Sequence, residues 1–218
     1  MKAFIIGIAG GVGLRLARLL TADGDHVDGL YRRSEQGELL EAHGIHATRG
    51  DLTRTGAPTL AALLRGTDVL VFAAGAGGEG GTNAITAIDG HGLSTAIEAA
   101  RLADVRRLLL VSVFPEAWRD REVSDTFEHY VETKKRADAE LAATALDWVI
   151  LRPAALTDDP GTGRISLAPA LVHTQVTRDD VAATLAELVH TPRLSREILE
   201  LTEGSTLIAD GVQQWIRG

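Results

Sequence analysis

Short apolar runs alternate with amphipathic stretches along most of this chain, and this alternation limits its possible folds more than any other feature. Strands that are apolar on both faces belong to parallel sheets covered by helices on both sides. Because crossovers between parallel strands are right-handed, the pattern predicts a doubly wound α/β fold of the Rossmann type. The expected strands are 3–8, 26–31, 45–48, 69–73, 107–113, 148–151 and 197–201, and the expected helices are 12–20, 35–42, 58–64, 84–103, 128–144, 179–189 and 211–216.

A chain of 218 residues has the length of one domain with a substantial core. No linker divides it, so we expect a single domain over 1–218. The strand–helix rhythm loosens after Pro153, and we expect a small, loop-built substrate region from the loops at about 113–127 and 154–177. The apolar residues of these loops form either a wall of that region or ordinary packing: Pro115, Trp118, Phe127, Leu156 and Leu171.

The charge and composition of the chain exclude several kinds of partner. The formal net charge of −8 opposes binding to nucleic acid, which needs a basic surface. The chain has no cysteine and its histidines lack ligand spacing, so we expect neither disulfides nor a metal site. The apolar run near the N-terminus is too short for a signal peptide, and no run approaches the roughly 18 residues of a membrane span. We therefore expect a cytoplasmic protein with a small-molecule substrate, as a monomer or homodimer.

A glycine-rich turn lies between the first predicted strand and the first predicted helix. Gly7, Gly10 and Gly13 have the spacing G-x-x-G-x-x-G, a variant of the dinucleotide-binding fingerprint. Glycine permits the tight turn and lets the backbone approach a diphosphate, and the helix N-terminus supplies free N–H groups. We expect Gly7, Gly10, Gly11, Val12 and Gly13 to bind a dinucleotide cofactor; the alternative is a purely structural turn.

Two arginines follow the second predicted strand. Arg32 and Arg33 stand where a site for NAD(H) usually has an acidic residue that binds the ribose 2′-hydroxyl. Guanidinium groups suit a 2′-phosphate, because they donate paired hydrogen bonds to its oxygens. The pair therefore favours NADP(H) over NAD(H); the alternative is a solvated pair at the start of a helix.

Tyr130 and Lys134 lie four residues apart in a predicted helix and so share one face of it. With two tyrosines and three lysines in the chain, this spacing is expected by chance at about 0.03. A nearby ammonium favours the phenolate, and a tyrosine tuned in this way can exchange a proton with a substrate oxygen while a hydride moves. The alternative is a helix-surface pair that serves only to contact the ribose of the cofactor.

Further short motifs follow the ends of other predicted strands: Gly50-Asp51-Leu52, Ala73-Ala74-Gly75, Ser112 and Arg152-Pro153. Together with the glycine turn and the Tyr–Lys pair, they resemble the short-chain dehydrogenase/reductase superfamily over nearly the whole chain. The likeness is to its small, atypical branch of NmrA-like and NAD-dependent epimerase-like NAD(P)-binding proteins. It implies that Asp51 and Leu52 lie at the adenine, that Ala73, Ala74 and Gly75 line the cofactor, and that the loop at Pro153 passes the nicotinamide.

The same resemblance implies a catalytic set. Ser112 stands at the position of the active-site serine that holds the substrate oxygen, and Tyr130 at that of the general acid/base. Lys134 would tune Tyr130 and bind the nicotinamide ribose. Typical members carry an asparagine where this chain has Asp89, a replacement common in the atypical branch. A carboxylate there can pair with Lys134 directly or attract a cationic group.

These motifs predict an NADP(H)-dependent oxidoreductase or epimerase that acts on a small, oxygen-bearing substrate. Two alternatives stay open. NmrA-like proteins include non-catalytic dinucleotide sensors, which need the glycine turn and Arg32 but have no use for Ser112, Tyr130 and Lys134. A flavin or quinone reductase transfers hydride with little need for a proton donor.

Overall fold

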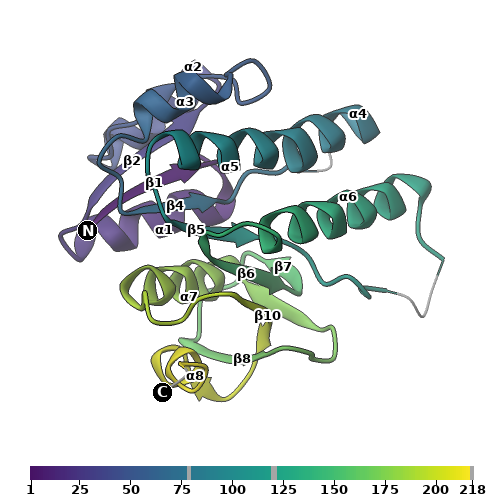
Figure 1. The fold of residues 1–218 in the computed structure, drawn as a ribbon. Helices are drawn as coiled ribbons and strands as arrows, with labels where there is room; N and C mark the ends of the chain where they lie inside the picture. Colours follow the sequence, from purple (N-terminus) through teal and green to yellow (C-terminus); the bar gives the residue numbers. More distant parts are fainter. Residues whose placement is uncertain (78–79, 119–121, 217–218) are drawn as a thin grey trace.

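The structure is a computed structural model that describes residues 1–77, 80–118 and 122–216. Its main strands are β1 (Lys2–Ile6), β2 (His26–Tyr31), β3 (Thr48–Arg49), β4 (Val69–Phe72), β5 (Arg107–Val111), β6 (Asp147–Pro153), β8 (Arg164–Ala168), β10 (Glu197–Glu203) and β11 (Thr206–Leu207). They form a nine-stranded sheet with the order β11-β8-β10-β6-β5-β4-β1-β2-β3 (Figure 1). Neighbours from β10 to β3 pair in parallel, whereas β8 and β11 pair antiparallel at one edge.

Helices cover both faces of this sheet (Figure 1). One face packs against α1 (Gly11–Ala22), α2 (Ser34–Ala42), α7 (Arg178–His190) and α8 (Ile208–Gln213). The other packs against α3 (Ala57–Leu63), α5 (Gly92–Leu102) and α6 (Asp125–Ala142). This arrangement confirms the predicted doubly wound Rossmann fold. In the described part of the chain, none of the helices has the length and apolarity needed to cross a membrane.

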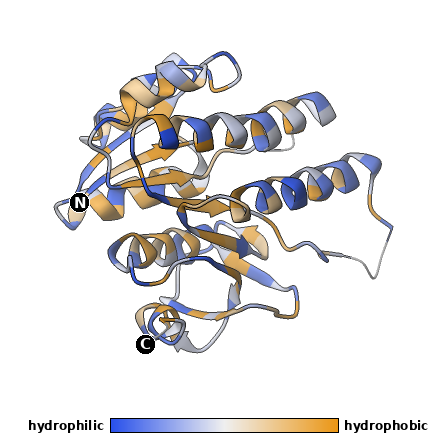
Figure 2. Ribbon diagram, in the orientation of Figure 1, coloured by the Kyte–Doolittle hydropathy of each residue, from blue (hydrophilic) through white to orange (hydrophobic). Residues whose placement is uncertain are grey.

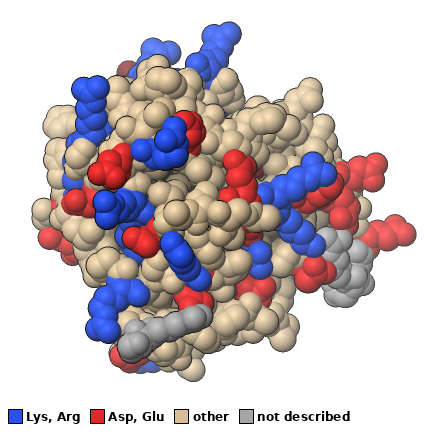
Figure 3. All heavy atoms as spheres, in the orientation of Figure 1, with Lys and Arg blue, Asp and Glu red and all other residues tan. Residues whose placement is uncertain are grey.

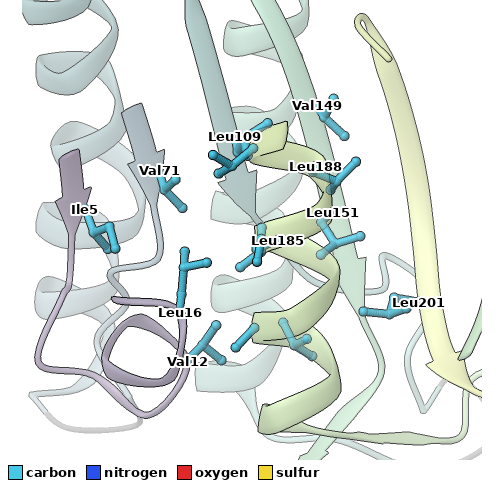
Figure 4. Close-up of a cluster of buried hydrophobic side chains, with 14 of the residues drawn as sticks. Ile5, Val12, Leu16, Val71, Leu109, Val149, Leu151, Leu185, Leu188 and Leu201 are labelled. Atoms are coloured by element: carbon cyan, nitrogen blue, oxygen red, sulfur yellow. The ribbon is translucent and has the colours of Figure 1, made fainter. Parts of the chain in front are cut away.

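Alternation along the strands divides the buried side chains between two cores. In β1, Ile5 points to the face covered by α1 and α7, whereas its neighbour Phe4 points to the opposite face. Figure 4 shows Leu16 of α1 and Leu185 of α7 meeting strand residues such as Val71 on the first face. The strands are accordingly apolar along their length, while the helices turn hydrophilic residues outward (Figure 2).

The region after β6 contains more regular structure than the predicted loops. A separate parallel pair joins β7 (Ala155–Thr157) to β9 (Gln175–Thr177), and β8 lies between them in the sequence. The strand β8 buries Ile165 and Leu167 but leaves Ser166 half-exposed, an alternation too short to stand out beside the turn residues around it. Of the other predicted loop, residues 119–121 lie outside the described part.

Several predicted elements differ in position or form. The third strand was expected at 45–48 and lies at Thr48–Arg49, because Ile45 enters the core from the loop before it. The last helix begins at Ile208 rather than at 211. The helix expected over 84–103 is a continuous run of α4 (Gly81–Ile85), a π-helical turn η1 (Thr86–His91) and α5.

The carboxyl ends of the parallel strands bring distant segments to one edge of the sheet. Gly7 follows β1, Ala73 follows β4, Ser112 follows β5 and Pro153 closes β6. In open α/β sheets, ligands bind outside the carboxyl ends of the strands. The fold therefore gathers most of the predicted site residues at one place.

Candidate active site

Packing makes two glycines of the turn obligatory. Gly7 has φ +88°, and a Cβ added to it would lie 2.7 Å from the backbone nitrogen of Ala74 after β4. A Cβ added to Gly13 would lie 2.2 Å from the carbonyl oxygen of Gly7, so only glycine lets α1 approach the turn so closely. Ala73 and Ala74 thus lie against the glycine turn, beside the place where the resemblance puts the cofactor.

Gly10 has a different environment. A Cβ added there meets a single neighbour, the Gly7 carbonyl oxygen, at 3.1 Å. Gly10 is the N-cap of α1, and no side chain in the described part of the chain caps the helix. The first backbone N–H groups, including those of Gly11 and Val12, are therefore left for a ligand. This cradle fits the diphosphate of a dinucleotide.

Arg32 and Arg33 occupy different settings after β2. Both are exposed, but the Arg33 guanidinium pairs with Glu35 at 2.9 Å (Nε to Oε1). Arg32 lies near Asp51, since its charge helps to hold the pKa of Asp51 low. The largest cause of that low pKa is the hydroxyl of Thr53, which donates to Oδ1 of Asp51 at 2.7 Å. The structure thus brings together the residues expected at the adenosine end.

Lys134 is the buried centre of the catalytic set. Its ammonium donates a hydrogen bond to the carbonyl oxygen of Val111 at 2.8 Å and lies 3.6 Å from Oδ1 of Asp89. The Asp89 carboxylate also accepts a hydrogen bond from the Ala76 backbone at 3.0 Å, so it fixes the segment that follows Gly75. The carboxylate of Asp89 therefore pairs directly with Lys134, which was one of the expectations from the sequence.

The π-helical turn η1 carries Asp89 into the site. Figure 1 shows α4 and α5 running as one long helix beside α6, and η1 lies between them in that run. Such turns are often found at functional positions. Burial raises the pKa of Asp89, and the attraction of Lys134 opposes this rise.

The hydroxyl of Tyr130 has a raised pKa, contrary to the expected stabilisation of a phenolate. Burial is the largest cause, followed by the negative charges of Asp89 and Asp138. The prediction that Lys134 lowers this pKa is wrong for this structure, because burial and the charges of Asp89 and Asp138 raise it. Tyr130 is therefore a neutral phenol, able to donate a proton.

Asp138 is a member of this cluster that the sequence reading missed. It follows Tyr130 and Lys134 at the same four-residue spacing, so it lies on the same face of α6. Its Oδ2 accepts from the Arg152 guanidinium at 2.9 Å (Nε) and 2.8 Å (Nη2). Burial raises the pKa of Asp138, and the neighbouring Ser112 hydroxyl and Arg152 oppose the rise.

Buried polar atoms in this cluster lack hydrogen-bond partners within the described residues. They are Ser112 Oγ, Asp89 Oδ1 and Asp138 Oδ1. A buried polar atom without a partner is costly and calls for an explanation, such as a ligand that completes its hydrogen bonds. Ser112, directly after β5, is thus suited to hold a substrate oxygen.

Aromatic rings extend from Tyr130 into the two loops expected to form the substrate region. The ring centroids of Phe127 and Tyr130 lie 6.2 Å apart, and those of Trp118 and Phe127 5.1 Å apart. His173 contacts Trp118 from the second loop at 5.4 Å and Phe114 at 5.2 Å. Of the five apolar residues named from sequence, Trp118 and Phe127 belong to this aromatic wall. Phe127 also packs against the core, as Leu171 does.

Acidic and basic side chains are mixed over the face of the molecule that Figure 3 shows. Within the described residues, no group of three or more His, Cys, Asp or Glu side chains is placed to hold a metal ion.

The protein has a Rossmann sheet with a glycine turn after β1, a serine after β5 and a Tyr–Lys pair on the following helix. This combination defines a dinucleotide-binding protein of the short-chain dehydrogenase/reductase type. Comparison with known proteins agrees with this class. The chain belongs to the NAD(P)H-binding family, which matches residues 7–192.

Three known proteins are similar to this chain over nearly its whole length. Over 216 residues, 98% of this chain and the whole of the relative, it is 35% identical to an uncharacterised sugar epimerase of Bacillus subtilis. A solved Bacillus halodurans protein, assigned as an NAD-dependent epimerase/dehydratase, is 29% identical with a TM-score of 0.88, covering 98% of this chain and 99% of that one. An anaerobillin reductase from Escherichia coli O157:H7 is 26% identical with a TM-score of 0.78, covering 93% and 97%.

Proposed function

We propose that this protein is an NADP(H)-dependent oxidoreductase or epimerase that acts at a carbinol or carbonyl carbon of a small substrate. One observation carries the proposal: Tyr130, Lys134 and the buried Ser112 hydroxyl, which has no hydrogen-bond partner among the described residues, belong to one cluster where the strands end. A non-catalytic sensor has no need of a buried cluster with unsatisfied polar atoms. The retention of this cluster therefore favours an enzyme.

In the reduction of a carbonyl group, each of these residues has a separate role. When bound, the nicotinamide supplies or accepts a hydride. Ser112 Oγ donates a hydrogen bond to the substrate oxygen, and Tyr130 donates a proton to the same oxygen. Lys134, held by Val111 and Asp89, binds the nicotinamide ribose and positions Tyr130. The raised pKa of Tyr130 keeps the proton available at neutral pH.

Cofactor choice rests on Arg32. Its guanidinium is exposed and stands near Asp51, where a ribose 2′-phosphate would lie in this fold. Arg33 is a weaker candidate, because Glu35 already pairs with it. These settings support NADP(H) as the preferred cofactor.

A flavin or quinone reductase is a second candidate, favoured by the aromatic wall. The rings of Trp118 and Phe127 continue from Tyr130, and flat conjugated acceptors stack well on such surfaces. Such an acceptor takes a hydride with little help from Tyr130.

The test is stopped-flow oxidation of NADPH with aldehydes, ketones, quinones and flavins, together with proton NMR of sugars for inversion at a carbinol carbon. We expect the parent protein to turn over a carbonyl or invert a sugar, and Tyr130→Phe to lose this activity by about 10²–10⁴-fold. Phenylalanine keeps the ring beside Phe127, so NADPH binding should persist. Equal quinone or flavin reduction by parent and variant would favour the second candidate. If the parent binds NADPH but turns over no compound, the result would favour the sensor.

A further inference from the structure

An ion-pair cluster connects the glycine turn with the segment after β7 and with the first turn of α7. Arg15 of α1 donates to Asp179 at 2.6 Å (Nε to Oδ1) and to the carbonyl oxygen of Gly11 at 2.8 Å. Its Nη2 also lies 3.3 Å from Oδ1 of Asp158. Arg178 pairs with the same carboxylate at 2.9 Å (Nη1 to Oδ2). Two guanidinium groups are therefore gathered beside the start of α1.

Arg178 lies directly against the glycine turn. A Cβ added to Gly11 would be 2.8 Å from Cδ and 3.0 Å from Nε of Arg178. Gly11 is the first residue of α1, where a diphosphate held by the turn carries its negative charge. A guanidinium here can donate two parallel hydrogen bonds to phosphate oxygens.

The two arginines differ in how firmly they are held. Arg15 has three oxygen partners, on Gly11, Asp158 and Asp179. Within the described residues, Arg178 pairs with Asp158 alone, whose side chain is 70% exposed. An exposed ion pair of this kind contributes little stability, so a diphosphate can compete with the carboxylate for Arg178. Asp158 would then keep its contact with Arg15.

We propose that Arg178 is a diphosphate-binding residue of the cofactor site, held by Asp158 until a dinucleotide binds. On binding, the Arg178 guanidinium exchanges the Asp158 carboxylate for phosphate oxygens. This inference uses only the NAD(P)H binding of the family and is independent of whether the protein is a catalyst. It extends the cofactor site from the glycine turn to the N-terminus of α7, a helix outside every motif recognised in the sequence.

The test measures binding of three ligands to the whole protein by isothermal titration calorimetry. NADPH and NADH both contain the diphosphate, whereas adenosine 2′-monophosphate has the 2′-phosphate and no phosphate at the 5′ position. We expect Arg178→Gln to weaken both dinucleotides by about tenfold or more, as for loss of a charge-assisted hydrogen bond. Binding of adenosine 2′-monophosphate should not change. Arg178→Lys should give an intermediate loss, because the charge stays and the paired donors do not.

Asp158→Asn tests the exchange itself. Removal of the competing charge should tighten binding of both dinucleotides, and this gain should vanish in the Arg178→Gln background. The exposed pair Arg101–Glu98, 2.7 Å apart at the end of α5, supplies Arg101→Gln and Glu98→Gln as charge-matched controls. The proposal is overturned if Arg178→Gln has no more effect than Arg101→Gln, or if it weakens NADPH and leaves NADH unchanged. Unfolding of each variant without ligand checks that the fold is retained.

Discussion

The ammonium of Lys134 lies 3.6 Å from a carboxylate oxygen of Asp89, and the two side chains are only 3% and 1% exposed. The pair neutralises two charges that would be costly to bury singly. Its carboxylate member also raises the pKa of the neighbouring Tyr130. Asp89 therefore anchors the lysine and keeps the tyrosine protonated.

Substitution of Asp89 should change the pH dependence of activity. Asp89→Asn removes one of the negative charges that raise the pKa of Tyr130, so this pKa should fall. A reduction that needs the neutral phenol is retained below the pKa and lost above it. The alkaline decline of the carbonyl-reduction rate should therefore begin at lower pH in Asp89→Asn, in a profile from about pH 6 to about pH 11.

The matched control for this profile is Glu132→Gln. Glu132 lies on the same helix as Tyr130 but pairs with Arg136 at the surface, and it is not among the groups that shift Tyr130. Its alkaline decline should match that of the parent. Identical alkaline declines for Asp89→Asn and the parent would contradict the influence of Asp89 on the pKa of Tyr130.

Two glycines of the turn should separate folding from cofactor binding. Gly13→Ala places a Cβ 2.2 Å from the Gly7 carbonyl oxygen, so it should lower the free energy of unfolding by about 1–3 kcal/mol even without ligand. Gly10→Ala meets the same oxygen at 3.1 Å and should affect unfolding far less. It should instead reduce the increase in Tm that NADPH produces. Thermal unfolding with and without NADPH measures both; a full NADPH shift in Gly10→Ala would contradict this assignment.

Arg32→Ala should weaken NADPH binding by about 1.5–3 kcal/mol, the contribution of hydrogen bonds to a charged group. NADH, which lacks the 2′-phosphate, should bind as before. Arg33→Ala is the control and should have a smaller effect, because Arg33 is paired with Glu35 at 2.9 Å. Fluorescence titration gives both affinities. Similar affinities of the parent for NADPH and NADH would mean that neither arginine binds a phosphate.

Arg152→Met should destabilise the protein in a pH-dependent way. Loss of one partner from a buried ion pair costs about 3–5 kcal/mol, and here it leaves the Asp138 carboxylate uncompensated. The pKa of Asp138 is already raised by burial and should rise further. A raised pKa in the folded state means that stability is retained at low pH and lost as the pH rises through that value. Urea unfolding should thus show a larger deficit at about pH 8 than at about pH 5; an equal deficit at both would contradict this account.

The parallel part of the sheet and the gathering of the site at one edge could be predicted, because both follow from local patterns. Apolar strands and the G-x-x-G-x-x-G motif can be recognised within a few residues. The parallel order of the strands then places Ser112 at the same edge of the sheet as the glycine turn. Asp138 could have been found as well, since it repeats the four-residue spacing of Tyr130 and Lys134 on α6.

Other features depend on contacts between distant segments. Arg178 meets Gly11 only once α1 and α7 pack side by side, and no local pattern marks it. The pKa of Tyr130 was predicted in the wrong direction because burial and two carboxylates outweigh one lysine. The antiparallel edge of β8 and β11 was missed because its strands are short and surrounded by turn residues.

The π-helical turn η1 lets one continuous helix pack against the sheet at one end and direct Asp89 into the site at the other. On α5, Leu93, Ala96 and Ala100 must face the sheet, and their angular positions are fixed by the core. In a helix of uniform pitch, the orientation of α5 would also fix the direction in which the side chain of residue 89 points. The wider turn between Thr86 and His91 uncouples the two ends, so Asp89 can be aimed at Lys134 while α5 stays in register with the core. The number of residues in this turn is therefore a determinant of the site's chemistry. Deletion of one residue from the turn should reorient the Asp89 carboxylate more than many side-chain substitutions would.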